Sequence, residues 1–258
     1  MTAPRLPLAF LQRPITHRAL HGLDENCPEN SRAAIRAAIA AGYGIEIDLQ
    51  LSADGQAMVF HDDELDRLTD ATGPVRARTA VELGTIALRH GDGECIPSFA
   101  EVLELVAGQV PLLIEIKDQD GAMGTNVGAL EAAAITDLRD YQGDVALMSF
   151  NPNSMAEVAR LAPHLARGLT TSAYDPLEWA PLSPARCDEL RDIPDFERVS
   201  ASFISHEASD VGCDRVRSLR AAGVPVLSWT LRTPAQEAEI ASLVDNVTFE
   251  NYLSAFGA

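Results

Sequence analysis

Apolar residues recur at every second position in several short segments of the chain, and helix-like segments lie between them. In GIEIDLQL at 44–51, isoleucine and leucine alternate with polar residues, which predicts a strand that points Glu46 and Asp48 to one face. Further strands are predicted from PITHR, AMVF, VPLLIEIKDQ, VALMSF, HLARGLTT, RVSASFISH, VPVLSWTL and VDNVTFE. Helices are predicted from SRAAIRAAIAAG, SFAEVLELVAG, NPNSMAEVARLAP, VRSLRAAGV and TPAQEAEIASL, several of which have a capping serine or asparagine before them and a glycine after them.

This alternation of strands and helices favours parallel βαβ units with right-handed crossovers. At 258 residues and 47% hydrophobic, the chain has the length of one α/β domain of the TIM-type (β/α)8 barrel class, and we treat residues 1–258 as a single domain. An open doubly wound sheet is the alternative, but no GxGxxG loop supports it. Residues 62–98 are polar and rich in turn-forming residues, which indicates a small insertion after the second strand, with a plain surface loop as the alternative.

The two acids of the strand at 44–51 are the first candidate site. Buried side by side, Glu46 and Asp48 would repel each other and lose hydration unless a cation or a proton compensated them. A metal site is therefore the economical interpretation, and a half-exposed strand whose polar face meets water is the alternative. Asp54 and Gly55 then predict a tight turn, after which the chain returns through AMVF to His61.

Two other predicted strands carry chemically active residues near their ends. PITHR ends in His17 and Arg18, and VPLLIEIKDQ carries Glu115 and Lys117 two positions apart, hence on one face. Each has an ordinary explanation when taken alone, as a packed histidine or as an ion pair. Together they indicate one site, because residues at the carboxyl ends of barrel strands converge on one face.

This set of residues resembles the glycerophosphodiester phosphodiesterase family, whose members carry the same motifs in the same order. The matching positions are His17-Arg18, Glu29-Asn30, Glu46 and Asp48, Asp54-Gly55, His61-Asp62, Glu115 and Lys117, and Trp229-Thr230. The chain departs from the family pattern at Ala19, where glycine is usual, and at Arg232, where asparagine is common. It also departs in its ending, because VDNVTFENY stands where the family usually has a glycine-rich segment that contains an aspartate. The resemblance implies that the insertion at 62–98 partly covers the mouth of the active site.

The resemblance also implies one divalent cation as cofactor, bound by Glu46, Asp48 and Glu115. Three carboxylates form a hard oxygen site, which suits Mg²⁺ or Ca²⁺ with water and phosphate oxygens as further ligands. The sequence does not choose between these two ions.

By the same resemblance, His17 and His61 are the expected general acid and general base, in an order that the sequence leaves open. Arg18 and Lys117 are expected to bind the phosphate. Trp229 is expected to form a wall near the leaving group, although a tryptophan late in a strand suits the core equally well. The nucleophile is either a glycerol hydroxyl of the substrate, which would give a cyclic phosphate, or water.

The formal net charge of −18 argues against a nucleic acid or an anionic membrane surface as a partner. We therefore expect a small glycerophosphodiester as the substrate. Because the protein as a whole repels an anion, we expect the metal, Arg18 and Lys117 to attract the phosphodiester locally. No apolar run approaches the roughly 20 residues that cross a bilayer. Because the N-terminal segment also lacks a convincing secretory core, we expect no transmembrane segment and a cytoplasmic location.

The cysteines and the remaining histidines give little signal. Cys27, Cys95, Cys187 and Cys213 are scattered without a CxxC pair, so the sequence signals neither a zinc site nor a redox pair. His206 follows a predicted strand end and is a candidate for the rim of the pocket.

The predicted function is metal-dependent hydrolysis of glycerophosphodiesters to glycerol 3-phosphate and an alcohol. One alternative is lysophospholipase D-like cleavage of lysophospholipids, which would need an apolar groove, whereas residues 62–98 are dominated by Asp, Arg, Thr and Gly. The other is a barrel that binds phosphodiesters without turnover, against which the two histidines and three acids argue. The sequence predicts neither the preferred alcohol nor the oligomeric state.

Overall fold

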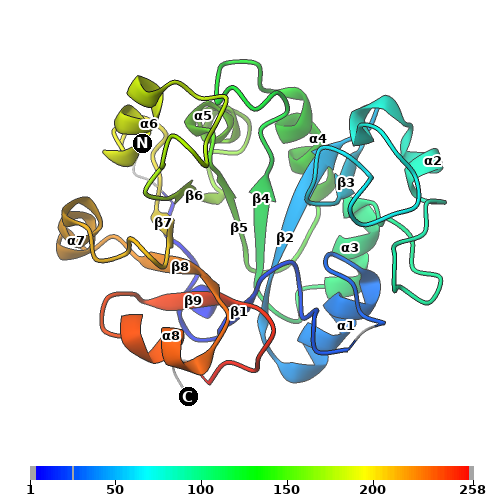
Figure 1. The fold of residues 1–258 in the computed structure, drawn as a ribbon, viewed down its shortest axis with the longest axis horizontal. Coiled ribbons are helices and arrows are strands. Elements are labelled where there is room, and N and C mark those ends of the chain that lie inside the picture. The colour runs from blue at the N-terminus through cyan, green and yellow to red at the C-terminus, as the bar shows by residue number, and fades with distance from the viewer. Residues whose placement is uncertain (1–3, 25, 256–258) are drawn as a thin grey trace.

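The computed structural model describes residues 4–24 and 26–255. Within these residues, eight strands pair in parallel around a closed barrel, and β1 closes it by pairing with both β2 and β9 (Figure 1). The barrel strands are β1 (Ile15–Thr16), β2 (Gly44–Leu51), β4 (Leu112–Ile116), β5 (Val145–Ser149), β6 (Ala166–Thr171), β7 (Phe203–Glu207), β8 (Val226–Leu231) and β9 (Asn246–Phe249). This arrangement confirms the predicted TIM-type barrel.

The helices follow the capping signals of the sequence. Ser31 accepts a hydrogen bond from the Ala34 N–H at the start of α1, and Gly42 ends that helix with φ 77°. Ser98 and Glu101 form a capping box at the start of α3. The helices around the barrel are α1 (Arg32–Ala41), α3 (Phe99–Val106), α4 (Ala129–Leu138), α5 (Pro152–Leu161), α6 (Pro184–Arg191), α7 (Asp214–Ala221) and α8 (Pro234–Ile240), and a 3-10 turn, η1 (Leu8–Leu11), precedes β1. Among the described residues, no helix has the length and hydrophobicity to cross a membrane.

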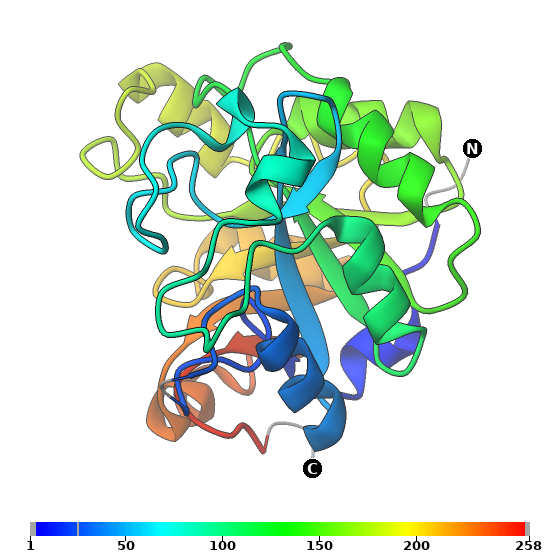
Figure 2. The same ribbon diagram turned by 90° about the vertical axis from the view of Figure 1, so that its right-hand side faces the viewer.

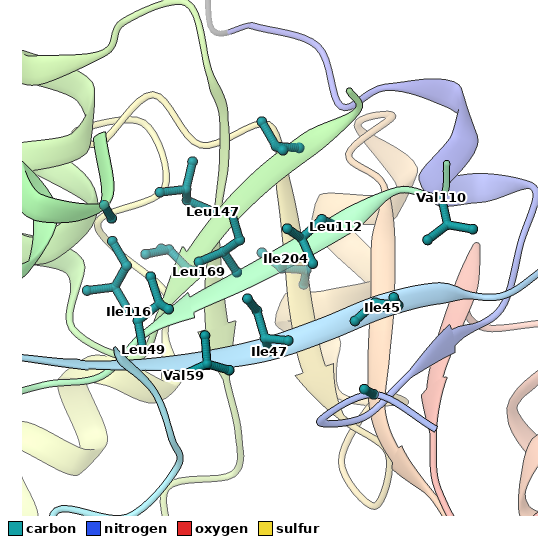
Figure 3. Close-up of a cluster of buried hydrophobic side chains, with 14 of the residues drawn as sticks. Ile45, Ile47, Leu49, Val59, Val110, Leu112, Ile116, Leu147, Leu169 and Ile204 are labelled. Carbon is teal, nitrogen blue, oxygen red and sulfur yellow. The ribbon is translucent and has the colours of Figure 1, made fainter. Parts of the chain in front are cut away.

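The period of two in the strands separates an apolar layer from a polar interior. Ile45, Ile47 and Leu49 of β2 are fully buried and lie among apolar residues of the neighbouring strands (Figure 3). Apolar residues of α1 and α3 belong to the same cluster. The alternate residues Glu46 and Asp48 therefore point into the barrel. Below the acids, the interior is filled by apolar side chains, namely Leu6, Phe10, Ile15, Leu113, Ala146, Ala166, Phe203 and Leu227, and Met148 of the same cluster reaches the cavity that the acids line. Polar chemistry is thus left to the carboxyl-terminal end.

The insertion begins earlier than predicted. β3 (Ala57–Val59) pairs antiparallel with the end of β2, so the chain leaves the barrel at the turn of Asp54 and Gly55 and not at residue 62. The following segment contains η2 (Val75–Ala77) and α2 (Ala80–Leu83) and lies beside β2 and β3, drawn in cyan (Figure 2). It encloses a small core of its own, made of Met58, Phe60, Leu65, Val75, Leu83, Leu88 and Ile96. The alternative of a plain surface loop is therefore wrong.

Candidate active site

Three carboxylates meet inside the barrel on β2 and β4. Asp48 and Glu115 are partners in the pairing of these strands, and Glu46 lies two residues before Asp48 on the same face. All three are buried, and their oxygens lie within 4.8 Å of one another. Burial raises the pKa of Glu46, and the charges of Asp48 and Glu115 raise it further. This buried excess of negative charge, presented by oxygen donors alone, fits a divalent cation.

Two cations compensate part of this charge. Lys117 Nζ lies 2.8 Å from Asp48 Oδ1 and 2.6 Å from Glu115 Oε1. Arg18 Nε lies 3.6 Å from Asp48 Oδ2, and the Arg18 backbone N–H donates to Glu46 Oε2 at 2.7 Å. Burial opposes ionisation of Asp48, but Lys117 and the other nearby cations outweigh it and hold the pKa of Asp48 well below its usual range. The ion pair of Glu115 and Lys117 is therefore real, and it belongs to the buried cluster.

The two imidazoles lie at the same cavity, but only one follows a barrel strand. His17 follows β1, whereas His61 lies two residues after β3, so the expectation that parallel strand ends supply every site residue is wrong for His61. His17 Nδ1 lies 2.6 Å from Glu250 Oε2, and His61 Nδ1 lies 2.6 Å from Asp62 Oδ1. Because an ionised carboxylate only accepts, each Nδ1–H donates and each Nε2 remains for the cavity. Burial lowers the pKa of His17 although the hydrogen bond that His17 donates to Glu250 opposes this, so the neutral ring is favoured.

Glu250 is a candidate site residue that the sequence analysis missed. It follows β9 directly, and its Oε1 lies 2.8 Å from Arg232 Nε. Its Oε2 contacts His17 and lies 3.5 Å from His21 Nε2. Two departures from the family pattern, the arginine at 232 and the altered C-terminal motif, therefore contact each other. An acid directly after the last barrel strand is the same kind of signal that pointed to His17, and it could have been recognised.

A second layer of side chains holds these groups. Asn30 Nδ2 donates to Asp48 Oδ2 at 2.9 Å, so Asn30 does more than precede the helix cap. Glu29 accepts from Arg18 Nη1 at 2.8 Å and from Arg67 Nη1 and Nη2 at 2.9 and 2.8 Å. Arg67 also donates to Asp62 Oδ2 at 2.7 Å, and Asp62 is the partner of His61. Through Glu29, Arg67 is therefore linked to Arg18, which follows His17 in the chain. No pattern in the sequence indicated Arg67.

Every predicted site residue except Asp48 lines one cavity of about 140 Å³. A neighbouring cavity of about 380 Å³ shares His61, Glu115, Lys117 and Phe150 with it. Trp229 forms part of the wall, because its Nε1 donates to the Ser205 carbonyl at 3.0 Å and its ring meets Phe150 edge to face at 5.4 Å.

Another cavity and His206 lie away from the two cavities of the candidate active site. A larger cavity, of about 700 Å³, lies beside α7 and contains none of the predicted site residues. His206, which the sequence offered as a candidate for the rim, lines neither cavity of the site. It bonds instead to Thr171 of β6, and it alternates along β7 with the inward-facing Phe203 and Ser205.

Comparisons with known proteins agree with this geometry. The model of the glycerophosphoryl diester phosphodiesterase family matches residues 17–249. A glycerophosphodiester phosphodiesterase of Caldanaerobacter subterraneus subsp. tengcongensis is 36% identical over 163 residues, which are 60% of this chain and 65% of that protein. The match thus spans slightly less than two thirds of that relative's length. A protein of the same name from Bacillus subtilis is 25% identical over 236 residues, covering 82% of this chain and 74% of the relative.

Solved structures extend the similarity over nearly the whole chain. A phosphodiesterase of Oleispira antarctica in complex with the product sn-glycerol-3-phosphate has a TM-score of 0.77 and 27% identity, covering 95% of each chain. A glycerophosphodiester phosphodiesterase of Agrobacterium tumefaciens has a TM-score of 0.64 and 26% identity, covering 96% of each chain. The resemblance noted in the sequence is therefore confirmed, and the chain belongs to the glycerophosphoryl diester phosphodiesterase family.

Proposed function

We propose that this protein hydrolyses glycerophosphodiesters to glycerol 3-phosphate and an alcohol. The observation that carries the proposal is the pair of imidazoles of His17 and His61, each bonded through Nδ1 to a carboxylate, beside a buried cluster of three acids. The similarity to the Oleispira antarctica phosphodiesterase with its product sn-glycerol-3-phosphate supports the choice of product.

One divalent cation, Mg²⁺ or Ca²⁺, is the proposed cofactor, with Glu46, Asp48 and Glu115 as its ligands. The buried negative charge around Glu46 and the oxygen-only donor set support this assignment. When bound, the ion would neutralise phosphoryl oxygens and polarise a hydroxyl group.

His17 and His61 are the proposed acid and base. One ring takes a proton from the attacking hydroxyl group, of water or of the substrate glycerol, as the new oxygen–phosphorus bond forms. The other ring gives a proton to the alcohol oxygen as its bond to phosphorus breaks. When the glycerol hydroxyl attacks, this step yields a cyclic phosphate, and water must then attack phosphorus and break the ring P–O bond, with the protonated glycerol oxygen as leaving group, to give glycerol 3-phosphate. Because both rings have the same kind of contact at Nδ1, with Glu250 and with Asp62, either order is consistent with the proposal.

Arg18 and Lys117 are the proposed phosphate contacts, and Trp229 is a proposed wall of the substrate pocket. Thr170 and Thr248 line the same cavity, and within residues 4–24 and 26–255 their buried hydroxyl groups have no hydrogen-bond partner. A buried hydroxyl without a partner is costly. A ligand rich in hydroxyl groups, such as the glycerol part of the substrate, would satisfy both.

The test is a panel of glycerophosphocholine, glycerophosphoethanolamine, glycerophosphoglycerol and lysophospholipids, assayed with Mg²⁺, with Ca²⁺ and without metal. We expect glycerol 3-phosphate from the deacylated diesters only when metal is present, and the exposed variant His164→Ala should behave like the wild type. Absence of turnover on the whole panel would contradict the proposal and favour a barrel that only binds phosphodiesters. The cytoplasmic location and the absence of a nucleic-acid partner stay predictions from the sequence.

A further inference from the structure

A second group of possible metal ligands lies outside the barrel interior. His206 is in β7, Asp210 is in the loop that follows, and Cys213 is the N-cap residue of α7. His206 Nε2 lies 3.2 Å from Asp210 Oδ2, and the ligand atoms of the three residues lie within 4.8 Å of one another. Neighbouring side chains along β7 point to opposite faces, and the inward-facing residues there are Phe203 and Ser205. This group is therefore separate from the three acids of the candidate active site.

The histidine of this group is oriented as a metal ligand usually is. His206 is only 1% exposed, and its Nδ1 lies 2.8 Å from Thr171 Oγ1 of β6. While Asp210 is ionised and no metal is bound, Nε2–H donates to Asp210 Oδ2 and Nδ1 accepts from the Thr171 hydroxyl group. In the other tautomer Nδ1–H donates to Thr171 and the lone pair of Nε2 is available to a metal, and a bond at the second ring nitrogen is what fixes metal-bound histidines.

The donor types differ from those of the active site. A nitrogen, a sulfur and an oxygen atom suit Zn²⁺, whereas three carboxylates suit Mg²⁺ or Ca²⁺. Zinc-ligand bonds of about 2.0 to 2.3 Å would require the ligand atoms to approach one another by up to about 1 Å. The side chain of Asp210 is 31% exposed, so it can move, and it leaves a path for the ion and for a water molecule as fourth ligand.

We propose that His206, Asp210 and Cys213 bind one Zn²⁺ ion, with water as the fourth ligand and Thr171 orienting the imidazole. Cys213 has a free thiol, which would lose its proton when the metal binds. The spacing His-x3-Asp-x2-Cys contains no CxxC pair, which explains why the sequence analysis did not signal zinc. The site would fix the β7–α7 loop beside the substrate pocket, because the Ala208 N–H donates to the Trp229 carbonyl at 2.7 Å.

Titration of the full chain with Co²⁺ tests the site without an activity assay. Cobalt bound to a thiolate gives a charge-transfer band in the near ultraviolet, and we expect this band in the wild type at one ion per chain. Cys213→Ser should abolish it. Cys95→Ser removes another partly exposed free thiol and should keep it, and Glu46→Gln should keep it because the active-site cluster has no sulfur.

Competition with Zn²⁺ then gives the affinity. Asp210→Asn, at a partly exposed position, should weaken zinc binding by at least about 10-fold, and Thr171→Val by about 10- to 100-fold, the usual effect of losing a residue that orients a ligand. Circular dichroism identifies any variant that has not folded. Absence of the band in the wild type, its survival in Cys213→Ser, or its loss in Cys95→Ser would each overturn the proposal.

Discussion

Glu250 accepts a hydrogen bond from His17 Nδ1 at 2.6 Å although 233 residues separate the two. The contact exists because β9 pairs with β1 where the barrel closes, so the last strand delivers its acid to the first histidine. Arg232 holds the other oxygen of the same carboxylate at 2.8 Å. The imidazole is thereby fixed with Nε2 free for the cavity.

Replacing Glu250 by glutamine should therefore impair catalysis more than substrate binding. We expect kcat to fall by about 10²-fold, with KM changed far less, because the oriented imidazole loses its charged partner. The hydrogen bond with Glu250 raises the pKa of His17 against the larger effect of burial, so its loss should lower this pKa further. The limb of the pH–rate profile that reports His17 should accordingly move to lower pH. If kcat and the profile matched those of the exposed variant Asp70→Asn, Glu250 would have no role in positioning.

Alanine substitution of His17 and of His61 tests the acid and base directly. Each variant should lower kcat by about 10² to 10⁴, the usual contribution of a positioned acid or base. The double variant should lose less than the product of the two effects, because groups that act as a unit are not additive. Near-native turnover by either single variant, measured beside His164→Ala, would remove that histidine from the mechanism.

Arg67 should make the free energy of unfolding depend on pH, because it donates hydrogen bonds to the carboxylates of Glu29 and Asp62. Burial raises the pKa of Asp62, but hydrogen bonds from His61 and Arg67 outweigh it and hold this pKa well below its usual range. The unfolded chain binds that proton more readily, so the stabilisation is complete above about pH 4 and is lost as the pH falls toward the folded-state pKa.

Arg67→Gln should consequently lower the free energy of unfolding by about 1 to 2 kcal/mol at pH 7, a value reduced for the partial exposure of this side chain. The difference from the wild type should shrink at pH 3. Urea unfolding at both pH values measures it, and Arg160→Gln serves as the control, because it removes an exposed ion pair within one helix. An equal loss at both pH values would show that the carboxylates do not carry the effect.

Local patterns in the sequence predicted the barrel and most of the candidate site, whereas contacts between distant segments escaped prediction. The alternation in β2 was sufficient to place Glu46 and Asp48 on one face, because side-chain direction in a strand depends only on the period of two. Glu250 and Arg67 contact residues 233 and 38 positions away, and such pairs follow from how the barrel closes and how the insertion folds back. The group of His206, Asp210 and Cys213 is short in sequence, but it requires the turn after β7 to bring its members together.

Residues 62–98 are dominated by Asp, Arg, Thr and Gly and contain no apolar stripe that would form a groove for an acyl chain, which leads to a prediction about substrate size. Each buried methylene group of an acyl chain would contribute about 0.8 kcal/mol, so an enzyme with a matching groove gains kcat/KM steeply with chain length. In the larger cavity at the site, Asp62, Asp63 and Asp118 lie among the apolar residues Ile116, Met123 and Phe150, so charged side chains interrupt its apolar wall. We expect glycerophosphocholine to be preferred over lysophosphatidylcholines of increasing length, compared below their micelle-forming concentrations. A strong rise with chain length would favour the lysophospholipase D-like alternative.

The metal dependence of product formation tests the proposed reaction most directly. Glycerophosphocholine is incubated with protein freed of metal by chelation, with the same protein after addition of Mg²⁺ or Ca²⁺, and with Glu46→Gln, and the phosphorus products are identified by ³¹P NMR. We expect glycerol 3-phosphate only from the metal-loaded wild type, and metal binding by Glu46→Gln that is far weaker although the variant remains folded. Full activity after verified metal removal, or release of phosphocholine in place of glycerol 3-phosphate, would contradict the proposed function.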